Sequence, residues 1–331
     1  MNAPTSPSNS PGESPTADLQ RFKRVTVIGA GVIGASWAAL FLAHGLTVCI
    51  NDPRAGIEGE VRELIARAGP VLQSLGLPTT FEPSALRFEP DLEQAVADAD
   101  VVQENGPERI DFKRALWARI EQAAPAHALM LSSSSALPAT DQAKEMKHPE
   151  RMLVGHPFNP PHVVPLVEVV PGRATSPQAV QEALAFYKAL GKSPQVIHKE
   201  IGGFVANRLQ SAIFRECVSL VSKGVVRVEE LDAIVTQSVG LRWAAGGPFL
   251  SFHLGGGEGG MRSFVQQFGP GMERRWASMS DEVKFDEATN ALLFEQADAA
   301  FGKRSRAELE TDRDATQIAI LRAIGEARGT S

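Results

Sequence analysis

Two side chains in apolar surroundings could perform acid–base chemistry. His156 follows the apolar run Met152–Gly155, and Glu168 lies inside the apolar run Leu166–Val170. Histidine can take a proton near neutral pH, whereas an acid within an apolar strand is costly unless it is paired. We therefore predict that Glu168 pairs with His156 and fixes its tautomer, and that His156 takes the proton of a substrate hydroxyl. A purely structural histidine is the alternative.

A glycine motif at the start of a predicted helix could bind the phosphates of a dinucleotide. An apolar run leads into G-x-G-x-x-G, and helical spacing follows over Ala35–Ala43. We expect Gly29 to permit the tight turn, Gly31 to let a pyrophosphate approach the backbone, and Gly34 to let helix and strand pack closely. The helix N-terminus supplies N–H groups and a positive dipole end for the phosphates.

An acid after the next predicted strand indicates which dinucleotide is bound. Asp52 lies 18 residues after Gly34, where a carboxylate can accept hydrogen bonds from the adenine-ribose hydroxyls of NAD and repel the 2′-phosphate of NADP. Arg54, two residues on, keeps NADP as the alternative. We predict NAD as the cofactor, with these contact residues: Gly29, Gly31, Val32, Ile33, Gly34, Asp52, Glu104, Lys113 and Ser133.

Composition and charge exclude several classes of protein. The 331 residues are 43% hydrophobic and 22% charged, which is typical of a globular chain of two domains. The net charge of −6 and the scattered basic residues predict no nucleic acid partner. Cys49 and Cys217 lie far apart, which predicts a reduced cytoplasmic protein without a disulfide or metal site. No apolar run reaches the roughly 18 residues that span a bilayer, so we expect no membrane partner.

Short apolar runs that alternate with longer amphipathic segments predict an α/β fold. We expect a Rossmann doubly wound parallel sheet over residues 21–199, preceded by a disordered tail at residues 1–20. Helices at Glu108–Ala123 and Pro177–Leu190 fit between strands. The expected strands are seven short apolar runs: Val25–Ile28, Thr47–Asn51, Val101–Gln103, Leu129–Ser132, Met152–Gly155, Leu166–Val170 and Gln195–Ile197.

The remaining residues, 200–331, predict an all-helical C-terminal domain for substrate binding and dimerisation. Apolar residues recur at helical spacing up to Gly224, which suits the position after a helix C-terminus, and a second helix is expected at Glu229–Val239. The stretch Gly246–Gly260 is rich in glycine, so we expect a loop there.

Several motifs in one order make the chain resemble the L-3-hydroxyacyl-CoA dehydrogenase superfamily. They are the glycine motif G-A-G-V-I-G, the 21-residue spacing from Ser135 to His156, H-P-F-N-P, L-V-E-V-V, and G-F-V-A-N-R around Asn207. The resemblance implies that His156 is the base, that Glu168 orients it, and that Ser135 and Asn207 contact the reacting oxygen. It also implies a supporting role for Asn159 and a homodimer.

Within that superfamily the chain is most similar to the branch that acts on free hydroxy acids, which includes the L-carnitine and L-gulonate dehydrogenases. The similarity to the carnitine enzymes is marked in residues 240–270. An independent argument disfavours coenzyme A, whose phosphates favour basic partners. No lysine lies between Lys23 and Lys113, and the arm Gly56–Gly76 carries only Arg62 and Arg67 as basic residues.

The substrate residues of a free-acid enzyme are expected in the helical domain. A guanidinium should receive the carboxylate, and Arg242 and Arg262 are the candidates. Trp243 and Phe252 could offer aromatic faces to a trimethylammonium group, with Phe249 as a further aromatic nearby. Surface pairing for the arginines, and core or dimer contacts for the aromatics, are the alternatives.

These observations predict an NAD-dependent oxidoreductase that oxidises the 3-hydroxyl of a small L-3-hydroxy acid, with L-carnitine as the first candidate substrate. L-gulonate, L-3-hydroxybutyrate and an L-3-hydroxyacyl-CoA are alternatives. An alternative of another class is a non-catalytic, crystallin-like protein that binds NADH.

Overall fold

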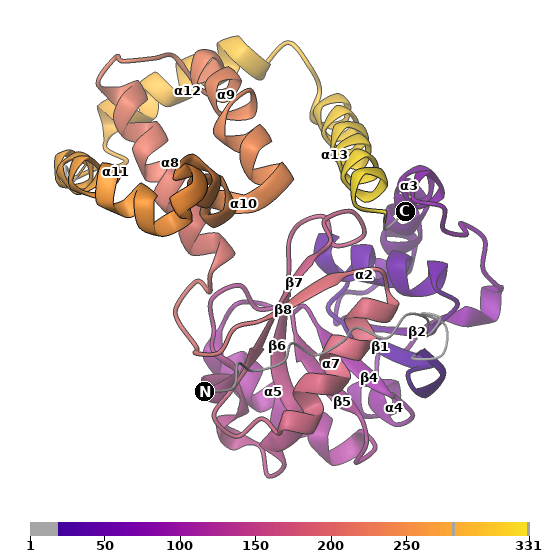
Figure 1. The fold of residues 1–331 in the computed structure, drawn as a ribbon. Coiled ribbons are helices and arrows are strands. Elements are labelled where there is room, and N and C mark those ends of the chain that lie inside the picture. The colour runs from indigo at the N-terminus through magenta and orange to yellow at the C-terminus, as the bar shows by residue number, and fades with distance from the viewer. Residues whose placement is uncertain (1–18, 280–281, 330–331) are drawn as a thin grey trace, which may run out of the picture. The chain divides into compact units, whose positions relative to one another are not determined.

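The computed structural model describes residues 19–279 and 282–329 and divides into two compact units, residues 1–205 and 206–331 (Figure 1). Of the predicted tail, residues 1–18 lie outside the described residues. Its last two residues belong to a single 3-10 turn, Leu19–Arg21, whose Leu19 packs against the core.

The first unit contains one eight-stranded sheet in the order β3-β2-β1-β4-β5-β6-β7-β8. All neighbouring strands are parallel except β6 and β7, so the predicted fold class is confirmed with one antiparallel pair added. The strands are β1 (Arg24–Ile28), β2 (Thr47–Asn51), β3 (Leu86–Phe88), β4 (Val101–Glu104), β5 (Leu129–Ser132), β6 (Met152–Pro157), β7 (Leu166–Pro171) and β8 (Ser193–Val196). The three-residue β3 was not predicted.

Helices cover both faces of this sheet, and each face has its own buried apolar cluster. The larger cluster lies under α2 (Val32–Ala43), α3 (Ile57–Ser74) and α7 (Pro177–Ala189). The second cluster lies under helices of the opposite face: α4 (Leu92–Val96), α5 (Ile110–Ala123) and α6 (Ala139–Gln142). The layered arrangement is visible in Figure 1.

The strand order reverses between β1 and β4, whose carboxyl ends lie side by side at Ile28 and Glu104. In open α/β sheets the ligand crevice lies at this switch point, outside the carboxyl ends of the strands. The glycine motif follows β1 directly, so the fold places it at this edge of the sheet.

The antiparallel pair has a direct cause in the chain. Only residues 158–165 connect β6 to β7, and a parallel partner would need a crossover of a dozen or more residues. The chain therefore turns back on itself. The resulting register places His156 opposite Glu168.

The second unit is helical, as predicted. Its helices are α8 (Ala206–Ser222), α9 (Val228–Thr236), α10 (Val239–Gly255), α11 (Gly260–Ser278), α12 (Glu287–Phe301) and α13 (Arg306–Arg328). Gly224 has φ 67° and follows α8, as its position in the sequence predicts. The predicted helix Glu229–Val239 is shorter, because the chain leaves the helix after Thr236 and begins α10 at Val239.

The prediction of a loop over Gly246–Gly260 is wrong. Helix α10 continues through most of this stretch, with one break at Gly247, where φ is 69°. Pro248 follows the break and begins the second part of the helix, where a backbone N–H would have no intrahelical partner, so the missing N–H of proline loses no hydrogen bond. Phe249 to Leu254 then continue the helix. A 3-10 turn at Gly257–Gly259 separates α10 from α11.

Three negative predictions concern the described residues. Both cysteines there are free thiols, and Cys49 is buried, which raises its pKa to about 11. Within residues 19–279 and 282–329, no group of three His, Cys, Asp or Glu side chains could hold a metal ion. No helix in the same ranges is long and apolar enough to cross a membrane.

Candidate active site

The predicted pairing of His156 with Glu168 is confirmed. His156 Nδ1 lies 2.8 Å from Glu168 Oε2, and the two residues are 5% and 2% exposed. Because a carboxylate only accepts hydrogen bonds, Nδ1 is the nitrogen that carries the proton. The tautomer so fixed directs a basic Nε2 away from the glutamate, and this nitrogen can take a proton from a donor.

The surroundings of His156 hold the ring in place. Its centroid lies 5.4 Å from that of Phe158 and 5.5 Å from that of Phe204. Phe204 is fully buried and has φ 49°, a left-handed conformation that is rare outside glycine. The backbone N–H of Val205 donates to Glu168 Oε1 at 2.9 Å, so the same carboxylate orients the histidine and anchors the segment after Gly203.

A serine turn follows β5 at the same edge of the sheet. The N–H groups of Ser135 and Ala136 donate to Glu108 Oε1 at 3.0 and 2.9 Å, and the Ser134 hydroxyl donates to the same oxygen at 2.6 Å. Ser135 is exposed, so its side chain lies at the surface of the turn. Sequence reasoning missed Glu108, although an acid four residues after Glu104 was a usable signal.

Glu104 and Lys113, predicted as cofactor contacts, form a buried ion pair. Lys113 Nζ lies 2.6 and 2.7 Å from the two carboxylate oxygens, and the residues are 0% and 1% exposed. Glu104 also accepts from the Ser132 hydroxyl and from the N–H of Gly106, each at 2.7 Å. A direct contact of either side chain with the cofactor would require this pair to open. Its position instead supports the chain segments at the ends of β4 and β5.

Ser133, also predicted to touch the cofactor, has three protein partners for its hydroxyl. Its Oγ accepts from Trp37 Nε1 at 3.2 Å and from Gln103 Nε2 at 2.9 Å, and donates to Asn105 Oδ1 at 2.7 Å. This hydroxyl therefore links α2 to the segment after β4. A contact with the cofactor would have to replace one of these bonds.

The glycine motif has the geometry that a dinucleotide needs. Gly29 has φ 78°, and a Cβ at Gly34 would lie 2.0 Å from the carbonyl oxygen of Gly29, so both positions exclude a side chain. A Cβ at Gly31 would meet nothing within 4 Å, which leaves room for a pyrophosphate. Helix α2 begins without a side-chain cap from any described residue, so the N–H groups of Val32 and Ile33 can serve an anion.

Asp52 lies beside this turn. Its Oδ2 accepts from the N–H of Ala30 at 2.8 Å, and Arg54 Nε lies 3.0 Å from Oδ1. Burial acts to raise the pKa of Asp52, but the hydrogen bonds from Arg54 and Ala30 hold that pKa below its ordinary value. A cavity of about 230 Å³ adjoins the carboxylate and is lined in part by Ile50 and Phe88. Asp52, this cavity and the glycine turn together fit the adenosine half of NAD.

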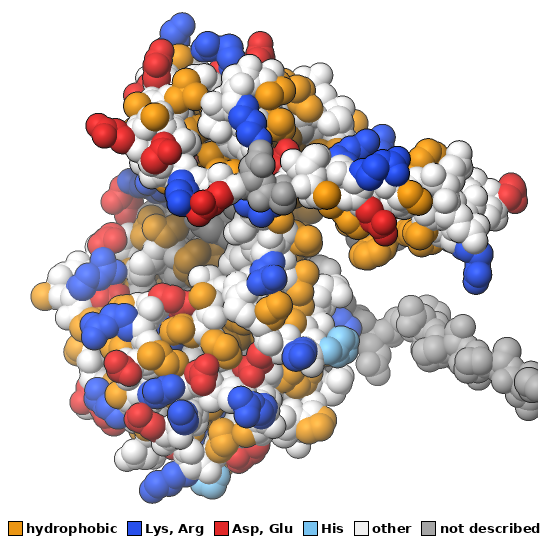
Figure 2. Space-filling model, turned by 90° about the vertical axis from the view of Figure 1, so that its left-hand side faces the viewer, with side chains coloured by type: hydrophobic (Ala, Val, Ile, Leu, Met, Phe, Trp, Pro, Cys, Tyr) orange, Lys and Arg blue, Asp and Glu red, His pale blue; other side chains and the backbone are white. Residues whose placement is uncertain are grey.

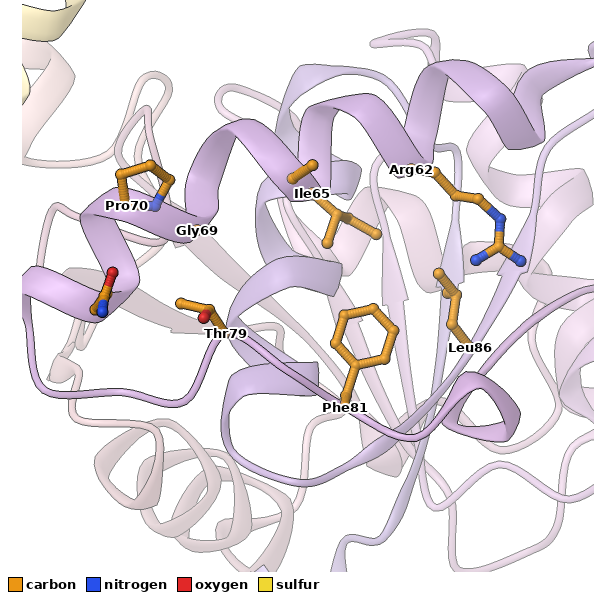
Figure 3. A pocket seen from close by; sticks show the side chains of 9 residues that line it. Arg62, Ile65, Gly69, Pro70, Thr79, Phe81 and Leu86 are labelled. Atoms are coloured by element: carbon orange, nitrogen blue, oxygen red, sulfur yellow. The ribbon is translucent and has the colours of Figure 1, made fainter.

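The arm after β2 shows no free basic surface. Both of its arginines pair with acids one turn earlier on α3, Arg62 with Glu58 at 2.7 Å and Arg67 with Glu63 at 2.5 Å. Beside α3 lies a cavity of about 440 Å³, shown in Figure 3, where Phe81 faces the helix and Arg62 marks one end. Its lining is mostly apolar, which does not suit the phosphates of coenzyme A.

Five predicted site residues lie in the second unit. Asn207 is half-buried near the start of α8. Arg242 is exposed and Trp243 half-buried on α10, and Arg262 is exposed on α11. Phe252 packs against Phe264, with ring centroids 4.9 Å apart. His156 belongs to the first unit, so these five residues lie in a different unit from the histidine.

Comparisons with known proteins agree with this geometry. Residues 24–201 match the 3-hydroxyacyl-CoA dehydrogenase, NAD binding domain, and residues 203–294 match the 3-hydroxyacyl-CoA dehydrogenase, C-terminal domain. The predictions of the family and of NAD as cofactor are thereby confirmed.

Individual relatives cover nearly the whole chain. L-carnitine dehydrogenase of Streptomyces griseus subsp. griseus is 43% identical over 321 residues, which is 96% of each chain. L-carnitine dehydrogenase of a Pseudomonas species is 42% identical over 94% of this chain and 96% of its own. The solved structure of 5-formyl-3-hydroxy-2-methylpyridine 4-carboxylic acid 5-dehydrogenase, an NAD⁺-dependent dismutase, is 28% identical with a TM-score of 0.73, covering 92% of this chain and 98% of that one. The chain belongs to the 3-hydroxyacyl-CoA dehydrogenase family and is an NAD-dependent oxidoreductase.

Proposed function

We propose that this enzyme oxidises the 3-hydroxyl of L-carnitine to the 3-oxo acid. The observation that carries the chemistry is the buried His156–Glu168 pair, with its Nδ1–Oε2 distance of 2.8 Å at the edge of a dinucleotide-binding sheet. The substrate follows from the relatives named L-carnitine dehydrogenase, at 43% and 42% identity over nearly the whole chain.

In this proposal His156 is the general base. Nε2 takes the proton of the 3-hydroxyl while Glu168 stabilises the imidazolium that forms. NAD⁺, when bound, accepts the hydride from C3. Ser135 and Asn207 contact the reacting oxygen, and Asn159, an exposed residue just after β6, helps to shape the site.

A free acid is favoured over a coenzyme A thioester by the arm after β2. Arg62 and Arg67 are both engaged by acids of the same helix, so an incoming diphosphate would have to displace a carboxylate at each. We assign the carboxylate of carnitine to Arg242 or Arg262, and its trimethylammonium group to the aromatic faces of Trp243 and Phe252.

A substrate panel tests the assignment. The purified enzyme is assayed with NAD⁺ at high pH against L-carnitine, L-gulonate, L-3-hydroxybutyrate and L-3-hydroxybutyryl-CoA. L-carnitine should give the highest kcat/KM. Efficient oxidation of the thioester, with no turnover of any free acid, would refute the proposal. NADH binding without turnover of any substrate would favour the non-catalytic alternative.

The aromatic assignment has its own test. Trp243→Leu or Phe252→Leu should raise KM for L-carnitine by roughly fivefold or more, because a cation–π contact contributes about 1 kcal/mol or more when desolvated. The KM of an uncharged analogue of equal length should change less. Equal changes for both compounds would show that the two aromatics only pack.

We also propose that the enzyme is a cytoplasmic homodimer. Most of the exposed large apolar side chains described lie on the helices of the second unit, among them Phe249 at 81% and Leu254 at 69% exposed. Figure 2 shows apolar side chains spread over this unit. We propose that a second copy of the chain covers these side chains, since burial of exposed apolar side chains favours association. Sedimentation should give about twice 35.5 kDa, and the monomer mass would exclude a stable dimer.

A further inference from the structure

A buried lysine contacts the loop of residues 158–165 that follows β6, and it has no carboxylate partner among the described residues. Lys192 is 8% exposed and connects α7 to β8. Its Nζ donates to the carbonyl oxygens of Pro161 and Val164 and lies 5.8 Å from the ring centroid of Trp37. Among residues 19–279 and 282–329, no ion pair within 4.0 Å is formed by this ammonium group. A buried charge held only by carbonyls and an aromatic face needs an explanation.

The loop that Lys192 contacts, residues 158–165, cannot hold itself by regular backbone bonding. Three of its eight residues are prolines, which have no N–H to donate. Its internal turn consists of two bonds from the N–H groups of Val163 and Val164 to the carbonyl of Pro160, at 2.9 and 3.0 Å. The buried carbonyl of Pro161 and that of Val164 therefore need outside donors, and a single ammonium group supplies both.

A second tie joins the same loop to the phosphate-binding helix. Ser36, which is buried on α2, has its Oγ 2.7 Å from His162 Nδ1. The same oxygen accepts from the backbone N–H of His162 at 3.1 Å. Two bonds thus fix the middle of the loop to a helix whose first turn carries the glycine motif.

Trp37 extends the connection toward the dinucleotide. Its ring lies against Lys192, and its Nε1 donates to Ser133, whose hydroxyl in turn donates to Asn105. The backbone of Asn105 borders Gly29, because a Cβ at Gly29 would lie 3.0 Å from the Asn105 carbonyl. A contiguous set of contacts therefore runs from the lysine to the phosphate turn.

We infer that Lys192 and the Ser36–His162 pair form a clamp that positions loop 158–165 against helix α2, and thereby sets His156 relative to the bound dinucleotide. The loop begins with Phe158, whose ring packs on His156, and Asn159 follows it. Lys192 is thus a positioning residue that acts through the loop. This inference rests on the proposed role of His156 as the base.

Charge on Lys192 strengthens the clamp, since hydrogen bonds from an ionised donor are stronger than neutral ones. Burial lowers the pKa of Lys192 to about 7, so the ammonium loses its proton within the range of ordinary assays. The titratable group coupled to it is His44, the residue after α2, whose pKa is lowered by burial and further by the charge of Lys192.

The test compares four single variants and one double variant of the full chain in assays with L-carnitine and NAD⁺. Lys192→Met removes the donors at similar length, Lys192→Arg retains donors, and Ser36→Ala removes the tie to α2. Lys188→Met is the matched control, because Lys188 is exposed on the last turn of α7. Active sites are counted by NADH titration, so kcat refers to folded protein, and hydride transfer is followed with L-[3-²H]carnitine.

We expect Lys192→Met to lower kcat at least tenfold and to raise the deuterium isotope effect on kcat/KM, with the control unchanged. Ser36→Ala should lower kcat about threefold, and Lys192→Arg should recover part of the loss. Because both ties hold one loop, the double variant Ser36→Ala/Lys192→Met should lose less than the product of the single losses.

A Lys192→Met enzyme that binds NADH at full stoichiometry and keeps kcat within twofold would overturn the inference. If Lys192→Met binds no NADH, the test rests on Ser36→Ala. A Ser36→Ala enzyme with unchanged kcat and an unchanged isotope effect would then overturn the inference. His156→Ala is assayed alongside. A native rate for His156→Ala would refute the proposed function, whereas loss of its rate together with unaffected clamp variants would refute the clamp alone.

Discussion

The sheet contains two buried glutamates, Glu168 on β7 and Glu104 on β4. They are equally buried, but they differ in whether their partner keeps a free atom for proton transfer. Each lies in an apolar strand, is at most 2% exposed and forms an ion pair or charge-assisted bond. Glu168 pairs with a histidine whose other ring nitrogen faces away from it. Glu104 pairs with Lys113 through both oxygens and accepts two further bonds.

The difference shows that the role of a buried acid depends on whether its partner still has an atom that can react. An imidazole held at Nδ1 still has Nε2 for proton transfer, so the His156–Glu168 pair can do chemistry. The ammonium of Lys113 is enclosed between Glu104 and Glu108, with the latter at 3.7 Å, and its neighbours are protein groups. We therefore expect substitutions in the first pair to affect rate and substitutions in the second to affect stability.

The largest effect is expected at His156. His156→Ala should lose about 10²–10⁴ in kcat, the range for loss of a general base, while the dissociation constant for NADH changes little. Glu168→Gln should lose less, because the amide retains the shape of the site but no longer stabilises the imidazolium. Steady-state kinetics and NADH fluorescence measure both quantities.

The control for this comparison is His148→Ala, since the His148 ring is exposed and lies 3.4 Å from the exposed carboxylate of Glu150. It should behave as the native enzyme does. If His156→Ala keeps most of its kcat at neutral pH, another residue is the base, and His162 would be the next to test.

Substitutions in the Glu104–Lys113 pair should lower the stability of the protein. Lys113→Met leaves Glu104 buried without its cation, which typically costs about 3–5 kcal/mol of unfolding free energy. The double variant Glu104→Gln/Lys113→Met should recover part of that loss, because no unpaired charge remains. Denaturant unfolding followed by circular dichroism measures the change. Lys113→Met with native stability and a large rise in the NADH dissociation constant would show instead that the pair opens to hold the cofactor.

Much of the first unit could be predicted because its signals are local. The glycine motif after β1 and the acid at Asp52 specify their own geometry, and Glu168 in an apolar strand demanded a partner that the sequence supplied at His156. The expected helix and strand alternation follows from periodicity, which needs no knowledge of distant contacts.

The wrong or missing predictions concern features that depend on contacts between residues distant in the sequence. Apolar content does not reveal that the short loop 158–165 forces β7 to run antiparallel, nor that Pro248 restarts a helix within a glycine-rich stretch. Glu108 and Lys192 act on backbone groups that are remote in sequence, Ser135 and Pro161 among them. Side-chain bonds to backbone carry no periodic pattern, so single-sequence reasoning does not find them.

A smaller effect is expected at a third acid, Asp52, which differs from both glutamates because its partner Arg54 is half exposed and can leave. In Asp52→Ala the guanidinium is released and can receive the 2′-phosphate of NADP, so the preference for NAD over NADP in kcat/KM should narrow by about tenfold or more. Arg54→Ala should not narrow it. Equal use of both cofactors by the native enzyme would contradict the role of Asp52.

The smallest change in stability is expected at Lys192, which extends the comparison to a buried cation that has no acidic partner among the described residues. Its pKa of about 7 in the folded chain lies below the ordinary lysine value of about 10.4 in the unfolded chain. Between these values the unfolded state binds more protons than the folded state, so stability rises with pH in that window.

From about pH 6.5 to about pH 8 the native chain should gain about 1 kcal/mol of unfolding free energy relative to Lys192→Met. Groups beyond the reach of the Lys192 charge contribute alike to both proteins and cancel in the difference. Both proteins carry His44→Gln, because burial and the charge of Lys192 lower the pKa of His44. Parallel stability curves for the two proteins would mean that Lys192 keeps its proton in the folded chain across this range, and that its bonds to the loop are those of an ammonium group.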